Sequence, residues 1–178
     1  NLAIAKISNI GYIDDFAFQR SFTQCGDDSR VEISNLSYIG KSAFYGCSKL
    51  VTADVFNNGN IGNSAFRNCT SLANLTLGEN VDSLGNAAFA NCSSLDEFRI
   101  PDHIPSMGEY CFSGCTSLKK MVVGSGIEQL HKGTYQNCTS LVDMTIGINV
   151  DTIEKINKAI YEYYALDNPT ISDQEYDK

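Results

Sequence analysis

The sequence of 178 residues has no tryptophan, only two histidines and only three prolines. Two histidines make a catalytic triad or a zinc site improbable. A Ser or Cys triad needs an imidazole beside the nucleophile, and a zinc site needs several further ligands. No apolar run reaches the roughly 18 to 20 residues that a membrane-spanning helix requires. We therefore expect no membrane insertion by this fragment.

Basic residues are also scarce, because 13 Lys and Arg stand against 21 Asp and Glu and give a formal net charge of −8. Nucleic-acid binding is not expected, since it depends on a positive surface that neutralises phosphates. The acids gather at one end: residues 151–178 carry seven acids and three lysines. This shift in composition predicts two parts, residues 1–151 and residues 152–178.

Common enzyme motifs are missing as well. The chain has no Gly-rich phosphate loop, no Gly-x-Ser-x-Gly elbow and no His-Glu-x-x-His motif. Cys111 and Cys115 form the only closely spaced cysteine pair, which supplies two of the four ligands that structural zinc needs. We expect Cys111 to replace a small alanine of the repeat instead. The sequence predicts a protein that is not an enzyme and has no catalytic residue, metal or cofactor.

Six of the seven cysteines are present at a fixed period. They are 22, 22, 23, 23 and 23 residues apart, at Cys25, Cys47, Cys69, Cys92, Cys115 and Cys138. An aromatic residue precedes each of them by three positions, at Phe22, Phe44, Phe66, Phe89, Phe112 and Tyr135. Such a period is typical of stacked structural repeats. We expect buried free thiols, because small thiols pack as hydrophobes; disulfides between neighbouring copies are the alternative.

A short strand follows each cysteine. One copy continues with Leu72, Leu75 and Leu77, and the last two of these alternate with polar residues, which is the period of a β-strand. A single copy buries too little apolar surface to be stable alone, so the copies must stack and share one core. The pattern predicts a repeat solenoid of about six turns of 22–23 residues with short parallel β-strands.

The residues between the inward positions of these strands form a predicted solvent-facing sheet. They are Arg30, Glu32, Thr52, Asp54, Asn74, Thr76, Glu97, Arg99, Lys120, Val122, Asp143 and Thr145. Solenoids use such ladders as extended binding faces, and simple solvation of a polar face is the other interpretation. No aromatic cluster of the kind common in binding hot spots marks this face.

The segment Ile-Gly-x-x-Ala-Phe-x-x-Cys-x-x-Leu, at residues 39–50 and 61–72, resembles the BspA-like leucine-rich repeats of bacterial and protozoan surface proteins. The resemblance extends over about residues 4–153 and implies a right-handed leucine-rich repeat coil. It also implies an extracellular or cell-surface adhesion module that binds a protein or cell-surface ligand. A receptor-binding component of a phage tail, located in the virion, is the alternative.

After residue 151 the repeat ends, and Ile153, Ile156, Ile160 and Tyr163 recur at spacings of three and four. This stripe predicts an amphipathic C-terminal helix that caps the solenoid or supports oligomerisation. The stretch from Tyr163 to Asp177 also resembles the N-terminal helical subdomain of NAD-dependent DNA ligases. That resemblance implies a second alternative, a nucleotide-linked role in which nicotinamide contacts Tyr163, Tyr164, Asp173, Tyr176 and Asp177.

Three Asn-x-Ser/Thr sequons are in phase with the repeat, at Asn68, Asn91 and Asn137. Each asparagine directly precedes a cysteine of the ladder. The pattern has two interpretations: N-glycosylation acceptors, or asparagines that adopt the left-handed backbone conformation that a turn needs.

Overall fold

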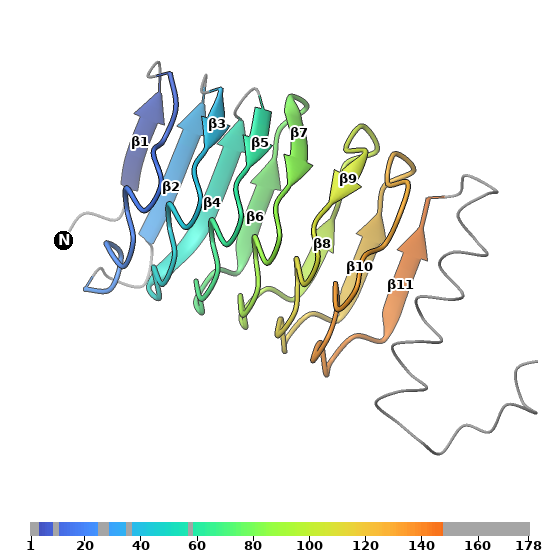
Figure 1. Ribbon diagram of the computed structural model, residues 1–178. Helices are drawn as coiled ribbons and strands as arrows, with labels where there is room; N and C mark the ends of the chain where they lie inside the picture. Colours follow the sequence, from blue (N-terminus) through green and yellow to red (C-terminus); the bar gives the residue numbers. More distant parts are fainter. Residues whose placement is uncertain (1–3, 9–10, 25–28, 35–36, 57–58, 148–178) are drawn as a thin grey trace, which may run out of the picture.

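The computed structural model, shown in Figure 1, describes residues 4–8, 11–24, 29–34, 37–56 and 59–147. The predicted C-terminal helix lies outside these residues. Among the described residues, no helix is long and apolar enough to cross a membrane.

The described chain is a parallel β-solenoid, as the sequence predicts. Strands on one side form a four-stranded and a three-stranded sheet, in the orders β1-β2-β4-β6 and β11-β10-β8. Their bounds are β1 Ile4–Ser8, β2 Ser29–Ser34, β4 Leu50–Phe56, β6 Asn74–Leu77, β8 Glu97–Arg99, β10 Lys120–Val123 and β11 Asp143–Ile146. A second side carries the order β3-β5-β7-β9, with β3 Tyr38–Ile39, β5 Gly59–Ile61, β7 Val81–Leu84 and β9 Ser106–Met107 (Figure 1).

The Ala-Phe-x-x-Cys segments form turns on the third side of each coil. In the second coil, Ser42 and Gly46 have φ of 54° and 71°, the left-handed region that breaks a regular helix. Between them the N–H of Phe44 donates to the carbonyl oxygen of Ala65 in the next coil, at 2.7 Å. The turns are therefore hydrogen-bonded from coil to coil, which satisfies backbone groups that neither sheet pairs.

The aromatic rings of successive coils form one continuous stack in the core. Phe44, Phe66, Phe89 and Phe112 are all 0% exposed. Their ring centroids lie 4.9, 5.4 and 5.5 Å apart, with interplanar angles of at most 13°. The predicted shared core is confirmed.

The sequence-based register of the first copy is wrong by four residues. Phe18, and not Phe22, stacks on Phe44, with a centroid distance of 5.1 Å and an interplanar angle of 9°. The ring of Phe22 is tilted by 44° against Phe44. Ser21 consequently holds the place that Cys47 holds in the next coil. The connection from this turn to β2 is longer than the matching connection in the second coil. The spacing of 22 residues between Cys25 and Cys47 is therefore a coincidence and not a repeat period.

The glycines directly after β5 and β7, Gly62 and Gly85, permit the close approach of neighbouring coils. A Cβ atom on Gly62 would lie 2.7 Å from the carbonyl carbon of Gly40, and one on Gly85 would lie 2.6 Å from the backbone nitrogen of Asn63. Side chains larger than hydrogen at these positions would push the coils apart.

The main sheet is interrupted between β6 and β8, which form no hydrogen-bonded ladder. At the end of β6 the N–H of Gly78 donates to Val55 of the preceding coil, and Gly147 donates in the same way to Val123, at 2.8 and 2.7 Å. The corresponding residue after β8 is Pro101. Because proline has no N–H, one inter-coil hydrogen bond is lost at this point.

Candidate binding face

The twelve residues predicted for the solvent-facing sheet lie in two parallel rows on each part of the main sheet. Arg30 pairs with Thr52 and Thr52 with Asn74, while Glu32, Asp54 and Thr76 form the second row. Beyond the interruption, the rows are Glu97, Lys120 and Asp143, and Arg99, Val122 and Thr145. The structure brings these residues together within each sheet. The sequence predicted one continuous sheet, whereas the structure has two.

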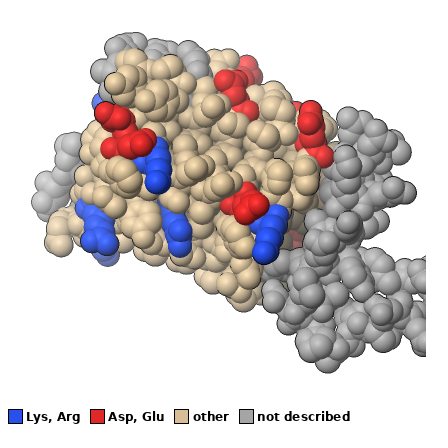
Figure 2. Space-filling model, in the orientation of Figure 1, with Lys and Arg blue, Asp and Glu red and all other residues tan. Residues whose placement is uncertain are grey.

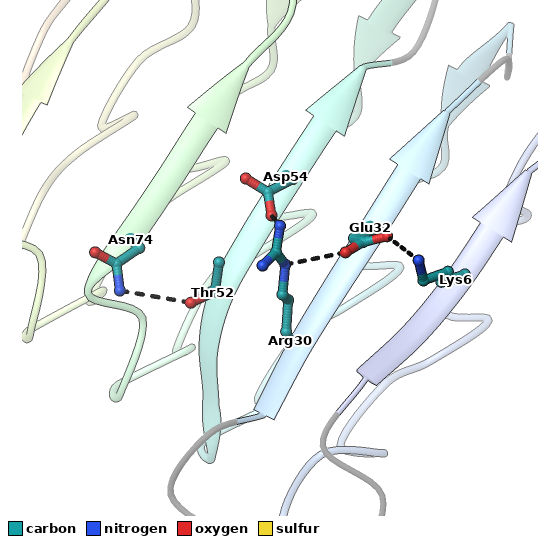
Figure 3. Close-up of polar contacts among 6 residues, drawn as sticks. All are labelled: Lys6, Arg30, Glu32, Thr52, Asp54 and Asn74. Atoms are coloured by element: carbon teal, nitrogen blue, oxygen red, sulfur yellow. Dashed lines mark hydrogen bonds and ion pairs between the residues drawn. The ribbon is translucent and has the colours of Figure 1, made fainter.

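A network of ion pairs organises the rows at the β1–β4 end (Figure 3). Arg30 contacts Glu32 through Nε at 3.3 Å and Asp54 through Nη2 at 2.8 Å. Lys6 extends the network to Glu32 at 3.0 Å. The prediction that Asp54 faces solvent is wrong: its side chain is only 11% exposed, and its carboxylate depends on Arg30 for compensation. These ion pairs link β1, β2 and β4 on this part of the face.

The row that begins at Arg30 continues toward β6 with neutral side chains. Asn74 donates through Nδ2 to Thr52 Oγ1 at 3.4 Å (Figure 3). Neutral amide and hydroxyl groups keep further donors and acceptors available to solvent or a partner.

The β8–β11 part of the face is more open. Lys120 Nζ lies 3.9 Å from Asp143 Oδ2, a long contact between two side chains that are each about half exposed. Arg99 turns toward the loop after its own strand and contacts Asp102 at 2.8 Å. Donation by the Ser125 N–H and the charge of Arg99 lower the pKa of the exposed Asp102 carboxyl. Glu97 and Lys120 therefore offer accessible charges of both signs.

A shallow hollow of about 410 Å³ adjoins this face at the ends of β4 and β6, lined by Phe56, Leu77, Gly78, Glu79 and Asn80. Phe56 is 48% exposed, and a Cβ on Gly78 would lie 2.8 Å from its ring. Glycine at 78 thus makes room for the ring. Our sequence analysis did not identify Phe56. The available signal was an aromatic residue at a position that later coils fill with glycine or proline.

Charges on the surface shown in Figure 2 are scattered. Lys and Arg side chains stand beside Asp and Glu, and most of this surface is uncharged. No continuous basic area is visible in this view of the described residues.

The described cysteines are buried free thiols, as predicted; Cys25 lies outside the described residues. Cys111 occupies the alanine position of the turn, because its carbonyl accepts the N–H of Phe89 as Ala88 accepts that of Phe66. Burial raises the pKa of Cys111 to about 12. No group of three or more His, Cys, Asp or Glu that could hold a metal is found among the described residues.

The phased asparagines serve the turns. Asn68, Asn91 and Asn137 have φ of 63°, 60° and 60°, at the position that Gly46 and Gly114 hold in other coils. Asn91 donates through Nδ2 to Asn68 Oδ1 at 2.8 Å, and Asn68 donates to Tyr45 Oη at 3.0 Å. The asparagines thus adopt the left-handed conformation, which supports the structural interpretation of the sequons. The five residues assigned to nicotinamide lie outside the described residues.

Comparisons with known proteins agree with this architecture. The family model for the BspA type leucine-rich repeat region matches residues 3–60 and 55–167, in six copies. A leucine-rich repeat protein of T. pallidum has a similar structure, with 21% identity, a TM-score of 0.69 and coverage of 88% of this chain and 84% of that chain. A leucine-rich cell surface protein of Faecalibacterium prausnitzii gives 21% identity and a TM-score of 0.60 over 86% of this chain and 34% of its own.

Curated relatives match a different and much shorter part. A DNA ligase of Clostridium tetani is 68% identical over 28 residues, and one of Clostridium novyi is 57% identical over 28 residues. Each match covers 16% of this chain and 4% of the ligase. The ligase resemblance is therefore confirmed as a local one. The six repeat copies, by contrast, span most of the sequence, and the chain belongs to the BspA-type leucine-rich repeat family.

Proposed function

We propose that this chain is a non-enzymatic adhesion module that binds a protein or cell-surface ligand through the main-sheet face, outside the cell. The observation that carries the proposal is the pair of aligned rows on that face. Arg30 holds Glu32 and Asp54 in place, so the partner meets a preorganised charge pattern and less side-chain entropy is lost on binding.

The neighbouring hollow adds an apolar contact to these charges. Phe56 is a half-exposed aromatic side chain beside Leu77 and acidic Glu79. Aromatic anchors in small pockets carry much of the energy of protein interfaces, while surrounding charges set orientation and association rate. A protein surface that presents an apolar side chain next to a basic one fits this arrangement.

The extracellular location is supported by family membership and by the similar F. prausnitzii structure, whose name describes a cell surface protein. The test is direct binding of the fluorescently labelled full chain to intact cells and to an immobilised extracellular-matrix preparation. We expect saturable binding that unlabelled chain displaces. Signal that rises linearly with concentration and resists displacement would contradict the adhesion proposal.

A second candidate function rests on the ligase-like match of 28 residues. It assigns nicotinamide binding to the C-terminal segment. Calorimetric titration of the full chain with nicotinamide mononucleotide tests it. Sub-millimolar binding that disappears in Tyr176→Ala and Asp177→Ala would support this role, and the absence of heat in the wild-type chain would reject it.

A further inference from the structure

Two exposed tyrosines stack against each other on the second side of the solenoid, beside the edge strand β3 (Figure 1). The ring centroids of Tyr12 and Tyr38 lie 5.0 Å apart, with an interplanar angle of 4°. Tyr12 is 49% exposed and Tyr38 is 38% exposed. The matching outward positions of later strands carry the polar residues Asn60, Ser83 and Ser106. Core packing therefore does not explain the two rings.

A third exposed aromatic side chain, Phe16, is held in an unfavourable backbone conformation. Its φ is 59°, in the left-handed region that bulky residues rarely adopt. The equivalent residues of the next three coils are small, at Ser42, Ser64 and Ala87, with φ of 54°, 56° and 53°. Phe16 is 47% exposed, so burial does not offset the backbone strain. Strain of this kind is concentrated at functional sites.

Two carboxylates adjoin the tyrosine pair. Asp14 and Asp15 are exposed, and within the described ranges neither forms an ion pair. Oδ1 of Asp14 accepts the N–H of Asp15 at 2.9 Å, and Oδ1 of Asp15 accepts the N–H of Lys41 at 2.7 Å. Partial burial, the neighbouring Tyr12 and the charges of the two carboxylates raise the pKa of Tyr38. The carboxylates are thus close enough to act on the ring pair.

The ammonium group of Lys41 does not neutralise these acids. Its Nζ lies 5.9 Å from the centroid of the Phe16 ring, within the range of a cation–π contact. The described structure has no ion pair between this ammonium and either carboxylate. Phe16 therefore holds the cation over its own ring, and a net negative charge remains beside the tyrosines.

We propose that Tyr12, Tyr38, Asp14 and Asp15 form a second binding site, which takes an arginine side chain of a protein partner. A guanidinium group stacks on aromatic rings and also pairs with carboxylates, and this surface offers both groups side by side. A neutral saccharide also stacks on tyrosine rings, but it carries no cation to compensate the two charges. The site lies on the second side, away from the main-sheet face, so it does not rest on the function proposed above.

The test uses the isotope-labelled full chain and the probe peptide acetyl-Gly-Arg-Gly-Arg-Gly-amide. Amide NMR shifts are recorded during the titration. The same peptide with citrulline in place of arginine keeps the side-chain shape and removes the charge. We expect saturable shifts at residues 12–16 and 38–41 with the arginine peptide. The citrulline peptide should bind at least about threefold more weakly.

Two double variants remove the two halves of the site. Tyr12→Ser/Tyr38→Ser replaces the rings with a residue that the same sheet carries in later coils. Asp14→Asn/Asp15→Asn keeps both Oδ1 acceptors and removes only the charges. We expect each variant to bind the arginine peptide at least about threefold more weakly than the wild-type chain. If the tyrosine variant does not fold, the asparagine variant decides the outcome, because its backbone contacts are retained.

Glu79→Gln/Asp82→Asn is the matched control, because it removes two exposed charges from a later coil. It should bind the arginine peptide within about twofold of the wild-type chain. The proposal is overturned by equal affinities for the two peptides, by an equal loss in the control, by shifts centred on residues 30–32, or by no saturable shift.

Two further measurements test other occupants of the same surface. Saturable shifts at residues 12 and 38 with maltohexaose, unchanged in the asparagine variant, would assign the surface to a saccharide and reject the arginine proposal. A wild-type dimer in sedimentation velocity that dissociates in the tyrosine variant would make a second copy of the chain the occupant. We expect neither result.

Discussion

The sulfur of Cys92 donates a hydrogen bond to the carbonyl oxygen of Phe66 in the preceding coil, with an Sγ–O distance of 3.3 Å. The same carbonyl accepts the N–H of Cys69, at 3.2 Å. Equivalent thiol contacts join Cys69 to Phe44 and Cys115 to Phe89, at 3.2 and 3.4 Å. The Phe-x-x-Cys spacing therefore positions one acceptor for two donors, one from its own coil and one from the next.

Cys92→Ala should destabilise the fold by about 1 to 2 kcal/mol, because it removes this hydrogen bond and leaves a small void. Cys111→Ala is the matched control, since alanine already occupies that position at Ala65 and Ala88. We expect the control to cost less than about 0.5 kcal/mol. Urea midpoints measure both changes. Equal losses in the two variants would argue against a specific role for the thiol bond.

Stability should fall as pH rises above about 9. Burial raises the pKa of Cys111 to about 12 and that of Cys138 to about 11, from an ordinary value of 9.0. The folded chain therefore holds these protons more tightly than the unfolded chain. Their contribution is complete below pH 9 and is lost as pH rises through the folded values. Cys47 has a pKa lowered to about 7, chiefly by hydrogen bonding with Cys69, and so adds stability as pH rises between 7 and 9.

Unfolding in urea at pH 7, 9 and 10.5 checks this prediction. Cys111→Ala should lose less stability between pH 9 and 10.5 than the wild-type chain, since it lacks one of the shifted thiols. A wild-type chain whose stability stays constant up to pH 10.5 would contradict it.

Phe89→Ala should cost about 3 to 5 kcal/mol, because it leaves a cavity between two stacked rings. Phe56→Ala removes an aromatic ring that is 48% exposed and should cost less than about 1 kcal/mol. Chemical denaturation of both variants gives the comparison. A loss below about 1 kcal/mol for Phe89→Ala would be incompatible with a shared aromatic core.

Pro101→Gly should join the two parts of the main sheet. The new N–H can donate to the preceding coil, as that of Gly78 does, and exchange in β8 should slow about tenfold. Pro105→Gly is the control, because it adds the same flexibility after the strand. If β8 exchanges at the wild-type rate in both variants, proline is not the cause of the interruption.

The periodic spacing was sufficient to predict the solenoid, the phenylalanine stack and the buried thiols, because each depends on one residue type at one phase of the repeat. The first coil was misassigned because Phe22 and Cys25 imitate the pattern that Phe18 and Ser21 fulfil. The residues of the main-sheet face were predicted from the alternation of inward and outward side chains along each strand. The interruption of the face depends on a missing N–H at Pro101, and the hollow depends on the contact of Phe56 with Gly78. Neither feature could be predicted from the repeat pattern, because each depends on which residues of neighbouring coils lie beside each other.

The central claim, that the main-sheet face holds the partner, is tested most directly with two matched triple variants. Asn74→Ala/Glu97→Ala/Lys120→Ala removes one amide, one acid and one base from the face. The control, Thr116→Ala/Asp82→Ala/Arg67→Ala, removes one hydroxyl, one acid and one base from exposed positions outside the main sheet.

Binding of the labelled 178-residue variants to cells or matrix is then titrated. We predict that the face variant loses at least about tenfold in affinity, equivalent to about 1.4 kcal/mol, while the control stays within about twofold of the wild-type chain. Equal affinities of the two variants, or a larger loss in the control, would contradict the account.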